Sequence, residues 1–103
     1  MLFQTSEKYF QEVLAESHTT PVLVDFYASW CAPCRILAPE LDALSEAYPI
    51  SAYSVNTDKE TNLTECYHVN VLPTVILFQN GQPAARWENH IPVSEIIEKI
   101  RLS

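Results

Sequence analysis

The sequence predicts a three-layer α/β domain, in which helices cover both faces of a central mixed β-sheet. Strand-like runs alternate with segments of helical period over the first two thirds of the chain, which favours parallel strands joined by helical crossovers. An Asn80-Gly81 pair between two further strand-like runs predicts an antiparallel hairpin, so the sheet is mixed. Because the chain has 103 residues, 48% of them apolar, we expect a single domain over residues 1–103.

The N-terminal half is predicted to contain two helices with a buried strand between them. Residues 1–3 are expected to add a short edge strand, and residues 6–18 carry apolar side chains at helical spacing. Residues 22–28 form a continuous apolar, β-branched and aromatic run, which is typical of a strand covered on both faces. From Cys34 onward the apolar residues again follow a helical period, so the second helix begins at the cysteines.

The C-terminal half is predicted to contain a strand, a helix, the hairpin and a closing helix. Residues 51–55 alternate enough for a short strand. Residues 57–60 have the Thr-x-x-Glu form of a capping box, which predicts a third helix through about Tyr67. Pro83 cannot donate a backbone hydrogen bond, which places the last strand at the edge of the sheet. Residues 92–102 have an amphipathic pattern that predicts a fourth helix against the sheet.

Acidic residues dominate the charge of the chain and exclude some classes of partner. Thirteen acidic against six basic residues give a net charge of -7. Because phosphate groups and anionic lipids are also negative, we expect neither nucleic acid nor a membrane as a partner. No window holds the roughly 18–20 consecutive apolar residues that cross a bilayer. Residues 1–10 lack the basic head and apolar core of a secretory signal, so we expect a cytoplasmic location.

Two of the three cysteines, Cys31 and Cys34, lie between the predicted buried strand and the second helix. An odd number of cysteines does not form the disulfide framework of a small secreted protein, so this pair indicates redox or metal chemistry. A helix N-terminus favours negative charge and lowers the pKa of a thiol from about 8.5 to about 3.5–7.5. We expect Cys31 to be the exposed nucleophile and Cys34 to attack the resulting mixed disulfide, while Pro33 stiffens the turn.

Asp25 is the polar residue inside the predicted buried strand. Burial without a partner raises the pKa of a carboxyl group, so Asp25 is a candidate general base for Cys34. The alternative is a carboxylate at a solvent-exposed edge of the strand, where Asp25 would not act as a general base.

Cys66 and His68 raise a zinc hypothesis together with the first two cysteines. Structural zinc takes four Cys or His ligands, commonly with two residues between paired cysteines, and Cys66-x-His68 has a different spacing. A lone cysteine in a helix is usually a packed small hydrophobe. We therefore expect Cys66 to be structural or incidental, and we expect no metal site.

The stretches VLVDFYASWCAPC, APELDAL and VLPTVILFQNG resemble thioredoxin in order and spacing over nearly the whole chain. The resemblance implies a thioredoxin fold and dithiol/disulfide exchange, with Cys31 as nucleophile, Cys34 as resolving thiol and Asp25 as buried proton acceptor. It also implies that Pro73 is cis and that substrates bind around Trp30, Ala32, Pro33, Val71, Leu72, Pro73 and Asn89.

Several positions depart from the usual pattern of the family. Ala32 stands between Trp-Cys and Pro-Cys, where the family usually has glycine. Val71 and Asn89 also replace common glycines, so their side chains should reshape the substrate groove. Ser54 aligns with a lysine that often faces the buried aspartate, which leaves Asp25 without that cation.

The resemblance implies a thioredoxin-type redox carrier that reduces disulfides of protein substrates and is itself reduced by a thioredoxin reductase. Such a carrier needs no metal or organic cofactor, and we expect a monomer. The alternative is a thioredoxin-fold binding or chaperone module in which the thiols are secondary. The paired cysteines argue against that alternative, because a pure binding module has no chemical need for them.

Overall fold

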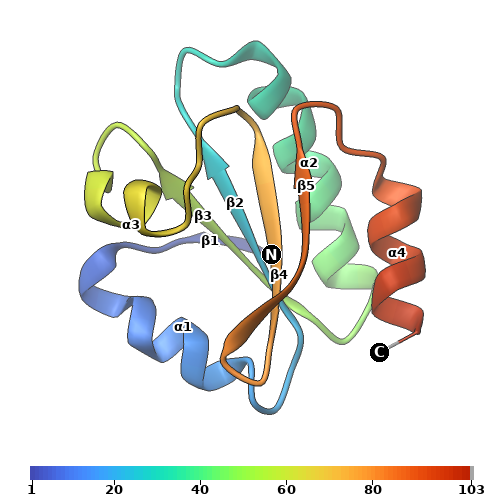
Figure 1. Cartoon of the computed structure of the whole chain (residues 1–103). Helices are drawn as coiled ribbons and strands as arrows, with labels where there is room; N and C mark the ends of the chain where they lie inside the picture. The colour runs from blue at the N-terminus through green and yellow to red at the C-terminus, as the bar shows by residue number, and fades with distance from the viewer. Residues whose placement is uncertain (103) are drawn as a thin grey trace.

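A five-stranded mixed β-sheet forms the centre of the computed structural model, which describes residues 1–102 (Figure 1). The order across the sheet is β1-β3-β2-β4-β5. Strands β1, β3 and β2 are parallel, β4 pairs antiparallel with β2, and β5 pairs antiparallel with β4. The strands are β1 Leu2–Gln4, β2 Val22–Tyr27, β3 Ser51–Asn56, β4 Thr74–Gln79 and β5 Gln82–Glu88.

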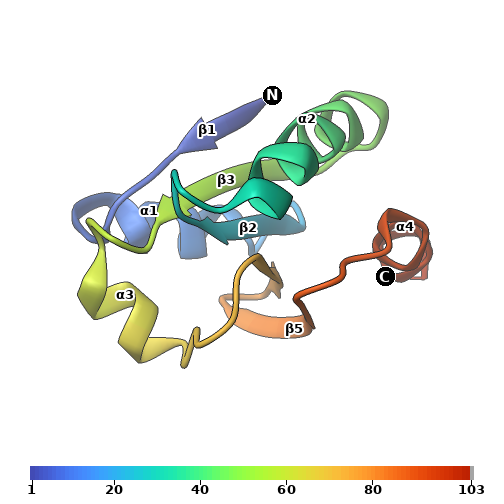
Figure 2. The same cartoon turned by 90° about the horizontal axis from the view of Figure 1, so that it is seen from above.

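Helices cover both faces of the sheet, as the view from above shows (Figure 2). Helices α2 and α4 lie on one face, and α1 and α3 lie on the other. A single 3-10 turn, η1, leads into α1. The helices are η1 Glu7–Tyr9, α1 Phe10–Glu16, α2 Ala32–Ala47, α3 Thr61–Cys66 and α4 Val93–Arg101. The predicted three-layer architecture is therefore confirmed.

The alternation of side chains along β2 divides the core into two apolar clusters. Val24 and Phe26 point to the face of α1 and α3, whereas Leu23 points to the face of α2 and α4. By the same alternation Asp25 points to the face of α2, the helix that begins at the cysteines. The strand thus directs its one carboxylate toward the dithiol.

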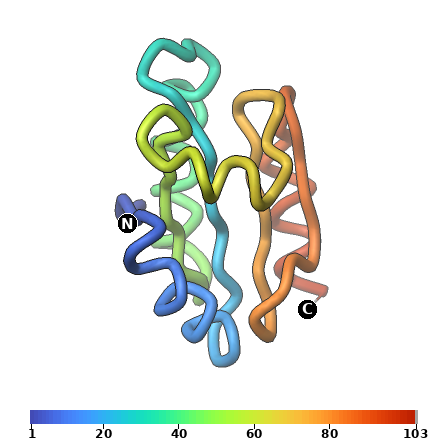
Figure 3. The backbone as a smooth tube through the Cα atoms, turned by 60° about the vertical axis from the view of Figure 1, so that its left-hand side comes forward, coloured from blue at the N-terminus to red at the C-terminus, as the bar shows by residue number. Residues whose placement is uncertain are grey.

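The antiparallel hairpin is confirmed, and Figure 3 follows it in orange. Asn80 and Gly81 both take positive φ angles, 55° and 78°, as a two-residue hairpin turn requires. Pro83 lies in β5 at the edge of the sheet, where its missing donor is not needed for pairing. The predicted short N-terminal strand is also present, at the opposite edge.

The predicted capping box at residues 57–60 is wrong. Helix α3 begins at Thr61, and the side chain of its N-cap, Glu60, makes no capping hydrogen bond. The backbone N–H and the hydroxyl of Thr57 instead donate to the Tyr27 carbonyl, at 2.9 and 3.1 Å. The Thr57 side chain, which the local pattern predicted to cap a helix, therefore forms a tertiary hydrogen bond to the end of β2.

Candidate functional site

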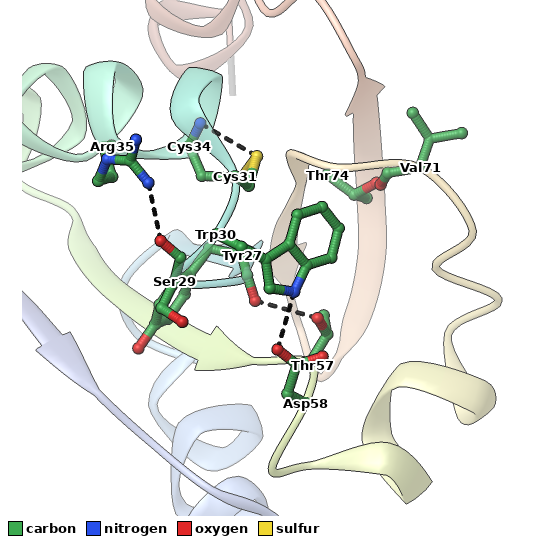
Figure 4. The surroundings of a disulfide bond; sticks show 10 residues. All are labelled: Tyr27, Ser29, Trp30, Cys31, Cys34, Arg35, Thr57, Asp58, Val71 and Thr74. Atoms are coloured by element: carbon green, nitrogen blue, oxygen red, sulfur yellow. Dashed lines mark hydrogen bonds between the residues drawn. A yellow bond between two sulfur atoms is a disulfide. The ribbon is translucent and has the colours of Figure 1, made fainter.

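Cys31 and Cys34 form a disulfide at the N-terminus of α2, after the short loop that follows β2 (Figure 4). Their Cα atoms are 5.3 Å apart. Cys31 is the N-cap of the helix, and its Sγ accepts a hydrogen bond from the Cys34 backbone N–H at 3.3 Å. Pro33 occupies the first turn, where a backbone N–H has no partner within the helix. A thiolate on Cys31 would therefore face the positive end of a 16-residue helix.

The exposure of two of the three cysteines differs from the sequence-based expectation. Cys31 is only 5% exposed in the disulfide, so the expectation of an exposed Cys31 is wrong for this state. It packs with Cys34 and Ala28 and against the partly buried Leu72, which lies far along the chain. Cys66 is exposed, so the interpretation of Cys66 as a packed structural residue is wrong and the incidental one remains. The short helix α3 buries only Leu63 and leaves Cys66 facing outward.

The surface beside the disulfide is partly apolar. Trp30 is 69% exposed, and its Nε1–H donates to Asp58 at 3.0 Å, which fixes the indole beside the cysteines (Figure 4). Val71 is also exposed, and its carbonyl accepts a hydrogen bond from the Thr74 hydroxyl at 2.6 Å. The Arg35 guanidinium donates to the Ser29 carbonyl at 2.8 Å and closes the other side of the loop.

Two hollows bring most of the predicted substrate-binding residues together on either side of Pro33. One hollow, of about 510 Å³, is lined among others by Trp30, Cys31, Ala32, Pro33 and Leu72. The second, of about 250 Å³, is lined among others by Pro33, Pro73 and Asn89. Residues from three separate parts of the chain therefore surround the disulfide.

The Leu72–Pro73 peptide bond is cis, as the resemblance implied. The Pro73 carbonyl accepts a hydrogen bond from the Asn89 backbone N–H at 2.9 Å, which ties the end of β5 to this bond. Asn89 has a positive φ of 67°, a conformation that asparagine adopts more readily than most residues. Asparagine thus keeps the backbone shape of the expected glycine while adding a side chain.

Asp25 is 1% exposed, so the alternative position at a wet strand edge is wrong. Its Oδ1 has no hydrogen-bond partner among the residues that the structure describes. Desolvation raises the pKa of Asp25 from 3.8 to about 7. Asp25 and Cys34 line one cavity of about 250 Å³. The structure therefore places a carboxyl group that titrates near neutral pH beside the inner thiol.

Sequence reasoning missed Asp58 and Arg35, which hold the loop around the cysteines. Trp30 and Asp58, which are hydrogen-bonded to each other, are 28 residues apart in the sequence, and no local pattern links them. Cys66 and His68, the remaining members of the zinc hypothesis, do not join the dithiol. Among residues 1–102 no three Cys, His, Asp or Glu side chains gather in a way that could hold a metal ion. Over the same residues, no helix has the length and apolar character to span a membrane.

Comparisons with known sequences agree with this geometry. The thioredoxin family model matches residues 1–102. The chloroplastic thioredoxin Y of Oryza sativa is 41% identical over 93 residues, which are 88% of this chain and 55% of that protein. A thioredoxin-like protein of Synechocystis sp. is 38% identical over 95 residues, which are 90% of each chain. The chain spans about half the length of the first plant relatives it matches.

Solved structures show the same fold over nearly the whole chain. Thioredoxin f2 of Chlamydomonas reinhardtii superposes with a TM-score of 0.88 at 30% identity, over 99% of this chain and 95% of that one. The thioredoxin pre-protein of Schistosoma mansoni gives a TM-score of 0.89 at 26% identity, over 98% and 96% of the two chains. On its fold, its Cys31–Cys34 pair and its sequence relatives, the chain belongs to the thioredoxin family.

Proposed function

We propose that the chain is a thiol-disulfide oxidoreductase that reduces disulfides of protein substrates through Cys31 and Cys34. The observation that carries this proposal is the disulfide between these residues at the N-terminus of α2 in a thioredoxin fold. A helix terminus lowers the pKa of a thiol and so favours the thiolate, the form that attacks disulfides. The binding-module alternative is not favoured, because it gives the paired cysteines no role.

The reaction begins with the reduced protein and ends with the Cys31–Cys34 disulfide. The Cys31 thiolate attacks one sulfur of the substrate disulfide, and the electron pair of that bond leaves on the other substrate sulfur. Asp25 accepts the proton of Cys34, and the Cys34 thiolate then attacks Cys31 Sγ. The bond between Cys31 and the substrate breaks, so the substrate leaves with both sulfurs reduced. A pKa of about 7 suits Asp25 to gain and lose this proton near neutral pH.

The two hollows beside Pro33 are the proposed substrate contacts. An extended substrate segment would pair with the backbone of Leu72 by strand addition, with its cysteine placed over Cys31. Trp30 supplies exposed apolar area next to the sulfurs. Val71 and Asn89 add side chains at the rim, which narrows the range of substrates that approach closely.

The proposed partners are protein substrates with disulfides and a thioredoxin reductase that restores the dithiol. One solved complex pairs a ferredoxin:thioredoxin reductase with thioredoxin f2, and its likeness to this chain, at 17% identity, concerns the fold alone. The net charge of -7 supports the proposal that neither nucleic acid nor a membrane is a partner. We further propose a monomer that works in the cytoplasm with no metal or organic cofactor, because exchange needs only the two thiols.

Single-turnover reduction tests the proposal. Reduced protein is mixed with a disulfide-bonded test protein, and both masses are measured after acid quenching. Each chain should lose two hydrogens and reduce one substrate disulfide, because the electrons come from the Cys31–Cys34 pair. Cys66→Ser is the matched control and should behave like the unmodified chain, whereas Cys31→Ser should be inactive. Substrate reduction by Cys31→Ser at the normal rate would contradict the proposal.

A further inference from the structure

The cavity beside Asp25 is lined by residues of β1, β2, β3 and α2. One of them, Ser54 of β3, has no role in the exchange mechanism described above. The parallel register of β2 and β3 sets Asp25 directly opposite Ser54, so both side chains point to the same face of the sheet. Ser54 is 9% exposed. Asp25, Ser54 and Cys34 line the same cavity of about 250 Å³. The small serine side chain leaves this space open next to the carboxylate.

In the described chain, Asp25 lacks a hydrogen-bond partner for one carboxylate oxygen, and the cavity has room for a water molecule that could supply one. Its Oδ1 is buried and has no hydrogen-bond partner among residues 1–102, and buried polar atoms almost always have one, in the protein or in ordered water. The cavity is several times larger than the roughly 30 Å³ that one water occupies in the liquid. Asp25 Oδ1 and the Ser54 hydroxyl give a water molecule two polar partners, the minimum that a buried water usually has.

We propose that Ser54 is a positioning residue whose hydroxyl holds a water molecule against Asp25, and that this water carries the proton of Asp25 to solvent. The inference rests on the proposed function, since Asp25 must lose a proton in each turnover. In the resolving step the proton of Cys34 passes to the Asp25 carboxylate. The neutral Asp25 then gives that proton to the water as the water gives one to solvent. Asp25 is thereby returned to the carboxylate form before the next substrate.

Few other groups compete for this proton. The other titratable or charged residues that line the cavity are Tyr27 of β2 and Cys34 and Arg35 of α2. The Arg35 guanidinium is hydrogen-bonded to the Ser29 carbonyl at 2.8 Å. From β1 the cavity receives Leu2, and β4 sets the apolar Val75 opposite Asp25 in the sheet. Within the described chain, the cavity lining therefore offers Asp25 no second carboxylate, no histidine and no lysine.

The first test measures the protonation of Asp25 directly, in the oxidised protein, by titrating its carboxyl carbon resonance. Ser54→Ala removes the hydroxyl and keeps the space, and Ser54→Val fills the space with methyl groups. Both should raise the pKa of Asp25, Ser54→Val by more, because each weakens hydration of the carboxylate. Ser51→Ala is the matched control on the same strand, since the Ser51 hydroxyl donates to Glu16 outside the cavity. An unchanged titration midpoint in both Ser54 variants would overturn the proposal.

The second test follows the resolving step by rapid quenching of the mixed disulfide from pH 6 to pH 9. Ser54→Ala should slow this step about fivefold near pH 7, because weaker hydration leaves less Asp25 in the carboxylate form that accepts the Cys34 proton; this factor is the one expected for the loss of one hydrogen bond. The same substitution in an Asp25→Asn background should have no further effect, because the proton acceptor is gone. Equal slowing in both backgrounds would assign Ser54 a merely structural role and overturn the proposal. If the unmodified protein reduced no disulfide at all, the proposed function would fail, while the Asp25 titration would still decide the role of Ser54.

Discussion

At the scale of single residues, the proposed disulfide exchange depends on Asp25. The sequence showed a carboxylate within an apolar strand, which indicated burial and a raised pKa but left a solvent-exposed strand edge as the alternative. The cavity beside it was not predictable, because its lining comes from β1, β2, β3 and α2. The exposure of Cys31 was predicted wrongly for a similar reason. Leu72 packs against the cluster that contains Cys31 in the folded chain, and nothing in the local sequence indicates that contact.

Replacing Asp25 by asparagine should stabilise the protein at alkaline pH. The folded-state pKa is about 7 and the unfolded one is close to 3.8, so the unfolded state binds fewer protons between these values. Stability of the unmodified protein should therefore fall as pH rises from 4 to 7 and then level off. Asp25→Asn removes this loss, on the order of 1–4 kcal/mol in the free energy of unfolding at pH 8.

Urea denaturation of the oxidised proteins at pH 4 and pH 8 measures this effect. The gain from Asp25→Asn should be larger at pH 8, because the buried charge is present only there. An equal difference between the two proteins at both pH values would show that Asp25 titrates normally in the folded state.

At the scale of elements, local signals succeeded where local contacts decide the structure. Asn80-Gly81 predicted the hairpin because only a few residues adopt the positive φ angles of its turn. The Cys-x-x-Cys segment predicted the start of α2, where Cys31 is the N-cap. The capping box at Thr57 failed because the Tyr27 carbonyl offered its hydroxyl a tertiary partner. The Trp30–Asp58 hydrogen bond could not be predicted either, because it is also a contact between residues far apart in the sequence.

The β4–β5 turn gives an element-scale prediction, since it docks on the end of α1. The backbone N–H groups of Asn80 and Gly81 donate to the carbonyl and hydroxyl of Ser17, both at 2.8 Å. Gly81→Ala should lower the free energy of unfolding by about 1 kcal/mol or more, because alanine is strained at a φ of 78°. Thermal denaturation measures the change, and disulfide reduction should be unaffected.

A second variant shows whether backbone strain or the contact with His18 causes the loss of stability in Gly81→Ala. A Cβ at Gly81 would lie 3.0 Å from Nε2 of His18, at the end of a side chain that can turn away. Adding His18→Ala to Gly81→Ala should therefore restore little of the stability. Full restoration would assign the cost to the histidine contact instead of the backbone, and an unchanged melting temperature in Gly81→Ala would contradict both causes.

At the scale of the whole molecule, the fold brings distant segments around one disulfide. Four segments meet there: the C-terminal ends of β2 and β3, the N-terminus of α2 and the segment before β4 (Figure 1). This arrangement is that of the thioredoxin family, and we propose that it serves disulfide exchange. If that claim holds, stopping the second half of the reaction should leave substrates attached to the protein.

Trapping with Cys34→Ser tests this most directly. The variant should accumulate mixed disulfides through Cys31, because attack on a substrate proceeds while the resolving step does not. Partners are captured from cell extract and compared on non-reducing gels with those of the double variant Cys31→Ser, Cys34→Ser. We expect that only the single variant holds partners and that dithiothreitol releases them. The same partners at the same yield on the double variant would contradict it, because recognition would then not depend on the thiols.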